Sequence, residues 1–282
     1  MKKLIVPVVL IVCSYFPAFS QNTSNPCRCT YSSGIEIPIS LRIVTYNVGN
    51  FSKYMPDSDS CISMIANMLH EFGTGIVGLN ECDSVNQRHN TNQVEDLSEA
   101  MGGWQWYFGR AMEWRGGAYG NGVLVPTGTT ILDRYTVSLP KGNGNEPRSI
   151  AVVETDKYIV GAVHLDNSKP FAQVQYVNAW AEEKYTNCDK PVFLIGDMNA
   201  QPQTATIAAL LESWNLLSGT EEATYTTRNP QKCLDYIFVY KMAAGVTLLG
   251  SGVLKQFESG DATMASDHFP VYVDVMLPLR SN

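Results

Sequence analysis

The chain has 282 residues, of which 45% are hydrophobic, 10% are aromatic and 17% are charged. This composition can build a large hydrophobic core and excludes a disordered or fibrous protein. The formal net charge is −7, and an acidic surface disfavours non-specific binding to nucleic acid, because that binding depends largely on Lys and Arg contacts with phosphates.

The first twenty residues have the pattern of a secretory signal peptide. A positively charged start is followed by an apolar stretch at 4–12 and by a small-x-small sequence at 18–20. The stretch is shorter than the roughly 20 apolar residues of a membrane-spanning helix. We therefore predict cleavage before Gln21, export to the periplasm or the medium, and no transmembrane segment in the mature chain. A minority interpretation makes Cys13 the lipidated residue of a lipoprotein signal, although Val12 stands where a small residue is usual.

Cleavage removes two lysines and no acid, which leaves 18 basic against 27 acidic residues and a formal charge of −9. The cysteines that remain are Cys27, Cys29, Cys61, Cys82, Cys188 and Cys233. An even number of cysteines in an exported chain permits disulfides, but six scattered over a large domain need not staple it. A structural zinc site is not expected, because Cys27 and Cys29 have no second Cys or His pair nearby.

A polar leader at 21–40 precedes a single domain, which we assign to 41–282. Strands are predicted at 41–48, 76–79, 104–108, 122–125, 129–139, 148–154, 158–164, 192–195, 234–240, 245–254 and 268–276. Helices are predicted at 57–72, 94–101, 171–185 and 203–217. The two kinds of element alternate without a Pro/Ser/Gly-rich linker, which predicts one α/β domain with mixed sheets.

Polar side chains mark one end of several predicted strands, most clearly in the segment 193–199. There an apolar run reaches Gly196 and is followed by Asp197 and Asn199. Side chains at i and i+2 of an extended segment share a side. Asp supplies a metal ligand or a base, and Asn supplies both a hydrogen-bond donor and an acceptor. The alternative interpretation is an ordinary Asx turn that closes the strand.

The same layout recurs at five further strand ends, at Asn47, at Glu81, at His164, at Asp235 and at the pair 267–268. A lone histidine is more often structural than catalytic, but two of the four histidines of this chain fall at these positions. An α/β sheet offers its ligand site at the loops beyond its strand ends. The recurrence therefore indicates a functional site.

These positions carry motifs that resemble those of the endonuclease/exonuclease/phosphatase superfamily in order and spacing. The motifs are TYNV at 45–48, NE at 80–81, HLD at 164–166, GDMN at 196–199, LDYIFV at 234–239 and SDH at 266–268. That superfamily includes deoxyribonuclease I, apurinic endonucleases, bacterial sphingomyelinases and inositol polyphosphate 5-phosphatases. The resemblance covers about 41–277. It implies a four-layer α/β/β/α sandwich of two mixed sheets and a phosphoester hydrolase that depends on Mg²⁺ or Mn²⁺.

The resemblance also implies how metal and phosphate are bound. Glu81 corresponds to the main metal ligand, and Asn47 and Asp267 lie next to the metal or its waters. Hard carboxylate and amide oxygens suit Mg²⁺. Arg148 resembles the family's arginine near the scissile phosphate. The family often has arginine just before the LDY segment, whereas this chain has Lys232 and then cysteine there, so any phosphate contact made at that point is altered.

The remaining roles implied by the resemblance concern proton transfer. Asp197 orients or deprotonates the attacking water, and Asn199 holds that water or a phosphate oxygen. His268, kept in place by Asp235, donates to the phosphoryl oxygens as negative charge builds on them. His164 contacts the phosphate or assists the leaving group.

We therefore expect a secreted, divalent-metal-dependent phosphoester hydrolase, most simply a phosphodiesterase or nuclease. Its nearest alternatives are a sphingomyelinase-like enzyme and an inositol-phosphate or sugar-phosphate phosphatase. An alternative of another class is a non-catalytic binding protein on the same fold, but such a protein has no reason to retain both Asp235 and His268. The expected partner is the phosphoester substrate, namely nucleic acid, a phospholipid head group or a sugar phosphate, and no stable protein partner is inferred.

The aromatic stretch 104–122 has two interpretations. The first is strand core followed by a Gly-rich turn. The second makes Trp114 and Arg115 a loop that stacks on or grips the substrate beside its phosphate.

Overall fold

The computed structural model describes residues 39–141 and 143–278. The predicted signal peptide, Cys13 and most of the predicted leader lie outside these residues. Across the described ranges, no helix combines the length and apolarity needed to cross a bilayer.

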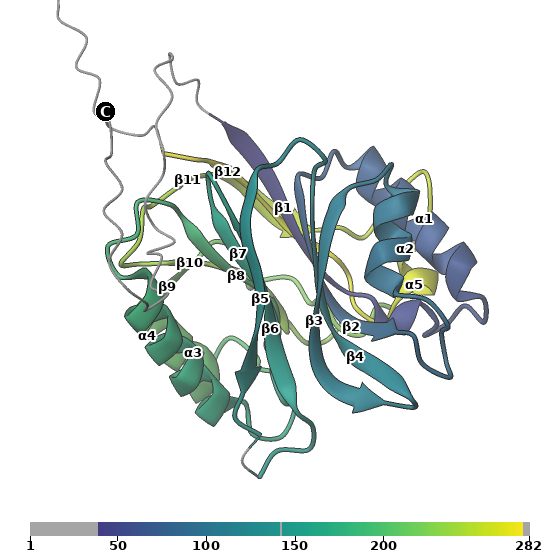
Figure 1. The fold of residues 1–282 in the computed structure, drawn as a ribbon, viewed down its shortest axis with the longest axis horizontal. Coiled ribbons are helices and arrows are strands. Elements are labelled where there is room, and N and C mark those ends of the chain that lie inside the picture. Colours follow the sequence, from purple (N-terminus) through teal and green to yellow (C-terminus); the bar gives the residue numbers. More distant parts are fainter. Residues whose placement is uncertain (1–38, 142, 279–282) are drawn as a thin grey trace, which may run out of the picture.

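Two six-stranded sheets lie face to face in the centre of the molecule (Figure 1). Sheet A contains, in order, β11 (Thr247–Val253), β12 (Val271–Met276), β1 (Ser40–Asn47), β2 (Ile76–Ser84), β4 (Gly117–Val125) and β3 (Gln105–Trp114). Sheet B contains β5 (Ile131–Leu139), β6 (Arg148–Thr155), β7 (Ile159–His164), β8 (Val192–Asp197), β10 (Asp235–Tyr240) and β9 (Trp214–Leu216). Both sheets are mixed, because β1 pairs with β2 and β7 pairs with β8 in parallel while their other pairs are antiparallel.

Helices cover the outer face of each sheet (Figure 1). Sheet A packs against α1 (Ser58–Glu71) and α2 (Gln93–Ala100), and sheet B packs against α3 (Pro170–Tyr185) and α4 (Ala205–Ser213). Two short helices, η1 (Gly49–Phe51) and α5 (Ala262–Ala265), stand in the connections. Apolar side chains fill the space between the sheets and the space under each helix pair. The predicted four-layer α/β/β/α sandwich is thus confirmed.

Small residues let the two sheets approach closely. A Cβ added to Gly78 of β2 would lie 2.4 Å from Cδ1 of Ile195 on β8, and one added to Gly109 of β3 would lie 2.6 Å from the Cβ of Ala151 on β6. Separations below 3 Å force a shift, so these two glycines are required where the opposing side chains press against the backbone.

The structure corrects several predicted elements: the strands expected at 104–108 and 122–125 are longer, as β3 and β4, and two further corrections have a clear physical cause. The helix expected at 203–217 ends at Ser213, and β9 follows because Trp214 turns into the core, packs against Tyr240 and donates its indole N–H to Asn178 Oδ1 at 3.0 Å. The strand expected at 76–79 continues to Ser84 as β2, because pairing with β4 resumes after an irregularity in register.

The stretch 104–122 forms most of the β3–β4 hairpin, which turns through Arg115 and Gly116. This agrees with the interpretation as strand core and a glycine turn. A role for Trp114 and Arg115 in gripping substrate remains a prediction.

The described residues contain four cysteines, all of them buried, namely Cys61, Cys82, Cys188 and Cys233. The disulfides that an even cysteine count permits are not formed among them. Burial raises the pKa of Cys61 to about 12 and that of Cys233 to about 11, which keeps both thiols protonated and poorly reactive.

Candidate active site

Strand ends from both sheets meet at one edge of the sandwich. Asn47 ends β1, His164 ends β7 and Asp197 ends β8. Asp235 begins β10, which is antiparallel to β8, so Asp235 lies directly across from Asp197. The structure therefore brings together side chains from distant parts of the chain, such as Asn47 and Asp197, which are 150 positions apart.

The centre of the cluster is the buried carboxylate of Asp197. Its Oδ2 accepts a hydrogen bond from Asn47 Nδ2 at 3.1 Å and lies 3.4 Å from His164 Nε2 and 3.6 Å from His268 Nε2. Burial raises the pKa of Asp197 to about 7, although the positive charge of His268 acts in the opposite direction. A carboxylate with a pKa near neutrality is suited to accept a proton during catalysis.

The chain turns sharply just after Asp197. Asn199 has a φ of 47°, and its N–H donates to Asp197 Oδ1 at 2.8 Å, which closes an Asx turn. The prediction that residues 197–199 form one extended segment is therefore wrong, because the strand ends at Asp197. The turn nevertheless directs Asn199 into the site, where its Nδ2 lies 2.9 Å from His164 Nε2 and donates to the carbonyl of Leu165 at 2.9 Å.

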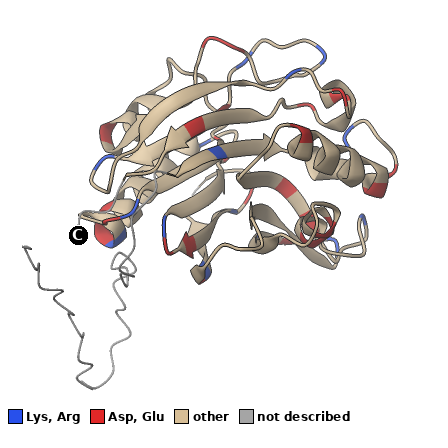
Figure 2. Ribbon diagram, turned by 90° about the horizontal axis from the view of Figure 1, so that it is seen from above, with Lys and Arg blue, Asp and Glu red and all other residues tan. Residues whose placement is uncertain are grey.

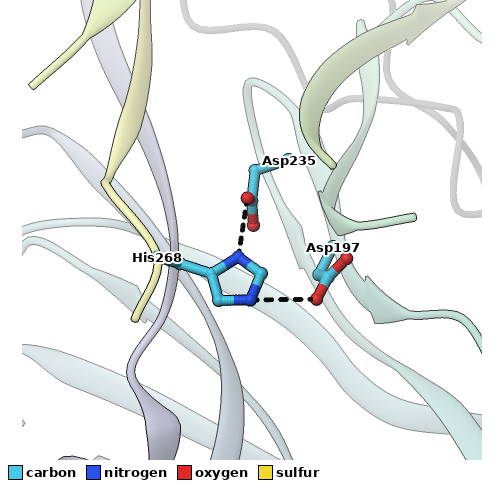
Figure 3. Close-up of side chains that lie close together, drawn as sticks. All are labelled: Asp197, Asp235 and His268. Carbon is cyan, nitrogen blue, oxygen red and sulfur yellow. Dashed lines mark hydrogen bonds and ion pairs between the residues drawn. The ribbon is translucent and has the colours of Figure 1, made fainter. Parts of the chain in front are cut away.

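His268 lies between two carboxylates (Figure 3). Its Nδ1 is 2.8 Å from Asp235 Oδ2, which also accepts a 2.6 Å hydrogen bond from the hydroxyl of Thr224. Burial by itself lowers the pKa of His268, but the carboxylates of Asp235 and Asp197 raise it to about 10. The imidazole is therefore protonated at neutral pH, with Nδ1–H held by Asp235 and Nε2–H directed toward Asp197.

The second histidine of the site, His164, is held in its neutral form. Arg148 Nη1 lies 3.0 Å from its Nδ1, and Asn199 Nδ2 faces its Nε2. Both neighbours are donors, and a neutral imidazole accepts through one nitrogen only, so at most one of these contacts is a hydrogen bond. Burial, followed by the charges of Arg148 and His268, lowers the pKa of His164 well below its ordinary value.

Arg148, which contacts His164, keeps one buried side-chain donor without an acceptor in the described part of the chain. Its Nη2 pairs with Glu146 at 3.1 Å, and its Nε is buried without a hydrogen-bond partner among the described residues. A buried guanidinium N–H without an acceptor is costly. An oxygen of a bound phosphate would satisfy it.

Glu81 lies beside Asn47 at the edge of the cluster. Its φ of 62° falls in the left-handed region, at the point of β2 where the register with β4 shifts, and such irregularities re-aim side chains next to active sites. Asn47 Nδ2 donates to Glu81 Oε1 at 3.1 Å. Asp267 lies nearby but is paired with Lys53, whose Nζ is 2.6 Å from Asp267 Oδ2.

Two sets of side chains at this edge are candidates for a metal ion. Asp197, Asp235 and His268 have ligand atoms within 4.8 Å of one another. A protonated imidazole has no lone pair to offer, so His268 does not fit a cation in this state. Glu81, Asn47 and Asp267 supply only carboxylate and amide groups, and their oxygens fit a hard cation such as Mg²⁺.

Two asparagines support the cluster from behind, although the sequence assigned them no role. Asn80 Oδ1 accepts from the N–H of Asp197 at 2.9 Å, and its Nδ2 donates to Asn121 Oδ1 and to the carbonyl of Val163. Asn121 in turn donates to the carbonyl of Ser149 at 2.8 Å. These bonds join sheet A to sheet B directly behind the site. Asn80 belongs to the NE motif at 80–81, and the signal for Asn121 is an asparagine beside the apolar run of a strand.

Asp166 is a third supporting residue. Its Oδ2 accepts from the N–H groups of Asn145 and Glu146 at 2.8 and 3.1 Å, and its Oδ1 accepts from those of Ser168 and Lys169 at 2.8 and 3.0 Å. Hydrogen bonds from Ser168 and from these backbone groups lower the pKa of Asp166 despite the opposing effect of burial. The ionised carboxylate fixes the loop that places Glu146 on Arg148.

The two facing mixed sheets and the carboxylate–imidazole cluster at their shared edge define a phosphoesterase of the α/β/β/α sandwich type. The chain belongs to the Endonuclease/Exonuclease/phosphatase family, whose model matches residues 44–268. Members of this family hydrolyse phosphoesters. None of the curated proteins matches the chain significantly.

Solved structures share the fold at low sequence identity. A mannosyl-6-phosphatase from Bacteroides thetaiotaomicron is 20% identical, with a TM-score of 0.63, over 83% of this chain and 99% of its own. An endonuclease/exonuclease/phosphatase from Beutenbergia cavernae is 18% identical, with a TM-score of 0.67, over 84% of this chain and 72% of its own. ANGEL2, a 2′,3′-cyclic phosphatase, is 13% identical, with a TM-score of 0.64, over 86% of this chain and 96% of its own.

Proposed function

We propose that the protein is an exported, Mg²⁺-dependent phosphoester hydrolase that acts first of all on phosphodiesters. The observation that carries the proposal is the buried Asp197 carboxylate, placed between the protonated His268 and the neutral His164. Arg148 contacts His164, and Asn47 donates to both Asp197 and Glu81. Export rests on the signal-peptide pattern of residues 1–20.

Each side chain has a defined task in hydrolysis. Asn199 holds a water molecule, and Asp197 takes its proton as the oxygen attacks phosphorus. The bond from phosphorus to the leaving oxygen breaks in the same step, and that oxygen then takes a proton from solvent. His268 donates from Nε2 to a phosphoryl oxygen, with Asp235 fixing the ring through Nδ1. The negative charge that develops on the phosphoryl oxygens in the transition state is stabilised best by hydrogen-bond donors that are already in place.

Arg148 and His164 serve as N–H donors to the remaining phosphate oxygens. Glu81, Asn47 and Asp267 would hold a divalent cation, which when bound would supply positive charge to the anionic phosphoester.

A second candidate function, a sugar-phosphate phosphatase, is favoured by Glu146. Its carboxylate lies 3.1 Å from Arg148 Nη2 and its side chain is 43% exposed. There it repels the flanking phosphates of a polynucleotide and can accept hydrogen bonds from sugar hydroxyls. Lys and Arg are also scattered over the ribbon rather than gathered on one face (Figure 2). The structural similarity to a mannosyl-6-phosphatase agrees with this candidate.

A substrate panel at fixed Mg²⁺ separates the candidates. We expect cleavage of bis-p-nitrophenyl phosphate, and cleavage of plasmid DNA that is slower and falls steeply as salt rises, because the acidic chain lacks a long basic track. Sphingomyelin and mannose 6-phosphate are assayed in parallel. Turnover of monoesters alone would replace the diesterase proposal by the second candidate. No turnover with Mg²⁺ bound would favour a binding protein.

The metal ligand is tested by Glu81→Gln. This change removes the carboxylate charge but keeps the shape of the side chain, so we expect Mn²⁺ affinity and kcat/KM each to fall at least about tenfold, with an unchanged circular dichroism spectrum. EDTA should abolish turnover, and added Mg²⁺ should restore it. Glu113→Gln is the matched control, because Glu113 has an 82% exposed side chain on β3. Full activity in EDTA contradicts a metal mechanism.

A further inference from the structure

A lysine occupies part of the proposed metal site. Lys53 follows η1, and its Nζ lies 2.6 Å from Asp267 Oδ2. The side chain of Asp267 is 8% exposed and that of Lys53 is 43% exposed, so the ion pair has one buried and one open side. A lysine is protonated at neutral pH, and the Lys53 ammonium lies against the carboxylate of Asp267 and in the field of Glu81. Lys53 is therefore a cation in the field of both carboxylates.

The backbone holds the Cβ of Lys53 close to the segment that begins at Asn47. Gly49 donates its N–H to Asn47 Oδ1 at 3.1 Å, and the Cβ of Lys53 lies 3.0 Å from where a Cβ on Gly49 would stand. The lysine side chain beyond this Cβ is flexible. The lysine ammonium binds phosphate as a point charge. The Lys53 ammonium can thus contact either Asp267 or the phosphate of a bound substrate.

We propose that Lys53 is the internal counter-ion of the metal site. Its ammonium neutralises Asp267 in the metal-free chain, gives up this carboxylate when a divalent cation binds, and then contacts the phosphate of the substrate. The reason is electrostatic, because an ammonium and a divalent cation repel each other strongly when they share one poorly solvated carboxylate. This inference rests on the proposed metal-dependent function.

The first test measures Mn²⁺ binding to the full chain by isothermal titration calorimetry. Lys53→Met removes the competing charge, and we expect Mn²⁺ to bind at least about fivefold more tightly, whereas Lys53→Arg keeps the charge and stays within about twofold of wild type. Lys255→Met is the matched control, because Lys255 also makes a 2.6 Å ion pair, with Glu222, and its side chain is 38% exposed. Unchanged or weaker Mn²⁺ binding in Lys53→Met overturns the counter-ion role.

The second test measures inorganic phosphate binding at saturating Mn²⁺. Lys53→Met should bind phosphate at least about fivefold more weakly than wild type, the opposite sign from the metal measurement. Unchanged phosphate binding overturns the phosphate contact. If Glu81→Gln abolishes the heat of Mn²⁺ binding, that binding is assigned to the site of Glu81, Asn47 and Asp267. A wild-type chain that binds no Mn²⁺ overturns the metal site itself, an outcome distinct from a failure of Lys53 alone.

Discussion

Replacing Asp197 by asparagine should lower kcat about a thousandfold, because the amide cannot take a proton from water and a positioned general base contributes roughly 10²–10⁴ to the rate. The hydrogen bond from Asn47 to residue 197 can persist through the remaining amide oxygen, so the geometry of the cluster should change little. The measurement is kcat for bis-p-nitrophenyl phosphate at saturating Mg²⁺.

The stability of the same variant separates a catalytic effect from misfolding. Because burial raises the pKa of Asp197 to about 7 in the folded chain, against about 3.9 in an unfolded one, stability decreases as pH rises between these values. Asparagine removes this cost, so the metal-free variant should melt at or above the wild-type temperature at pH 8.

The matched control is Glu154→Gln, a buried carboxylate on β6 that accepts from the hydroxyls of Tyr135 and Tyr185 away from the site. It should lower the melting temperature and leave kcat unchanged. A loss of activity below tenfold in Asp197→Asn would show that another group accepts the proton.

Asp235 and His268 should behave as one catalytic unit. Asp235→Asn and His268→Ala are each expected to lower kcat/KM by about 10²–10⁴, and the double variant should lose little more than the worse single variant, because residues that act together are strongly non-additive. The 2.8 Å contact between Asp235 Oδ2 and His268 Nδ1 is the physical basis of this expectation. Losses that multiply would mean that Asp235 acts independently of His268.

Much of the fold could be predicted from local patterns. Apolar runs, helical spacing and glycine-rich turns predicted most strands and helices, because these signals act over a few residues. The strand ends at Asn47, His164, Asp197 and Asp235 were found in the same way. Their convergence follows from pairing, because parallel neighbours end at the same edge and β10 runs antiparallel to β8.

The features that the sequence missed depend on contacts between distant segments. The pairing of Lys53 with Asp267 joins residues more than two hundred positions apart, and no local sequence pattern predicts it. The left-handed backbone of Glu81 arises from a register shift against β4, which a pattern of apolar residues does not encode. The end of α4 was misplaced because the burial of Trp214 against Tyr240 overrides local helix propensity.

The site draws its side chains from both sheets, and this has a consequence for its tolerance of distant change. Asn47 and Glu81 move with sheet A, whereas Asp197 and His164 move with sheet B. The spacing of the two sheets is set by side-chain packing and by hydrogen bonds such as those of Asn80 and Asn121. A change in the spacing between the two sheets, even one made far from the site, therefore changes the distances between the catalytic side chains at their shared edge. A methyl group added at Gly78 would lie 2.4 Å from Cδ1 of Ile195, so it should shift one sheet against the other and lower kcat in addition to the melting temperature.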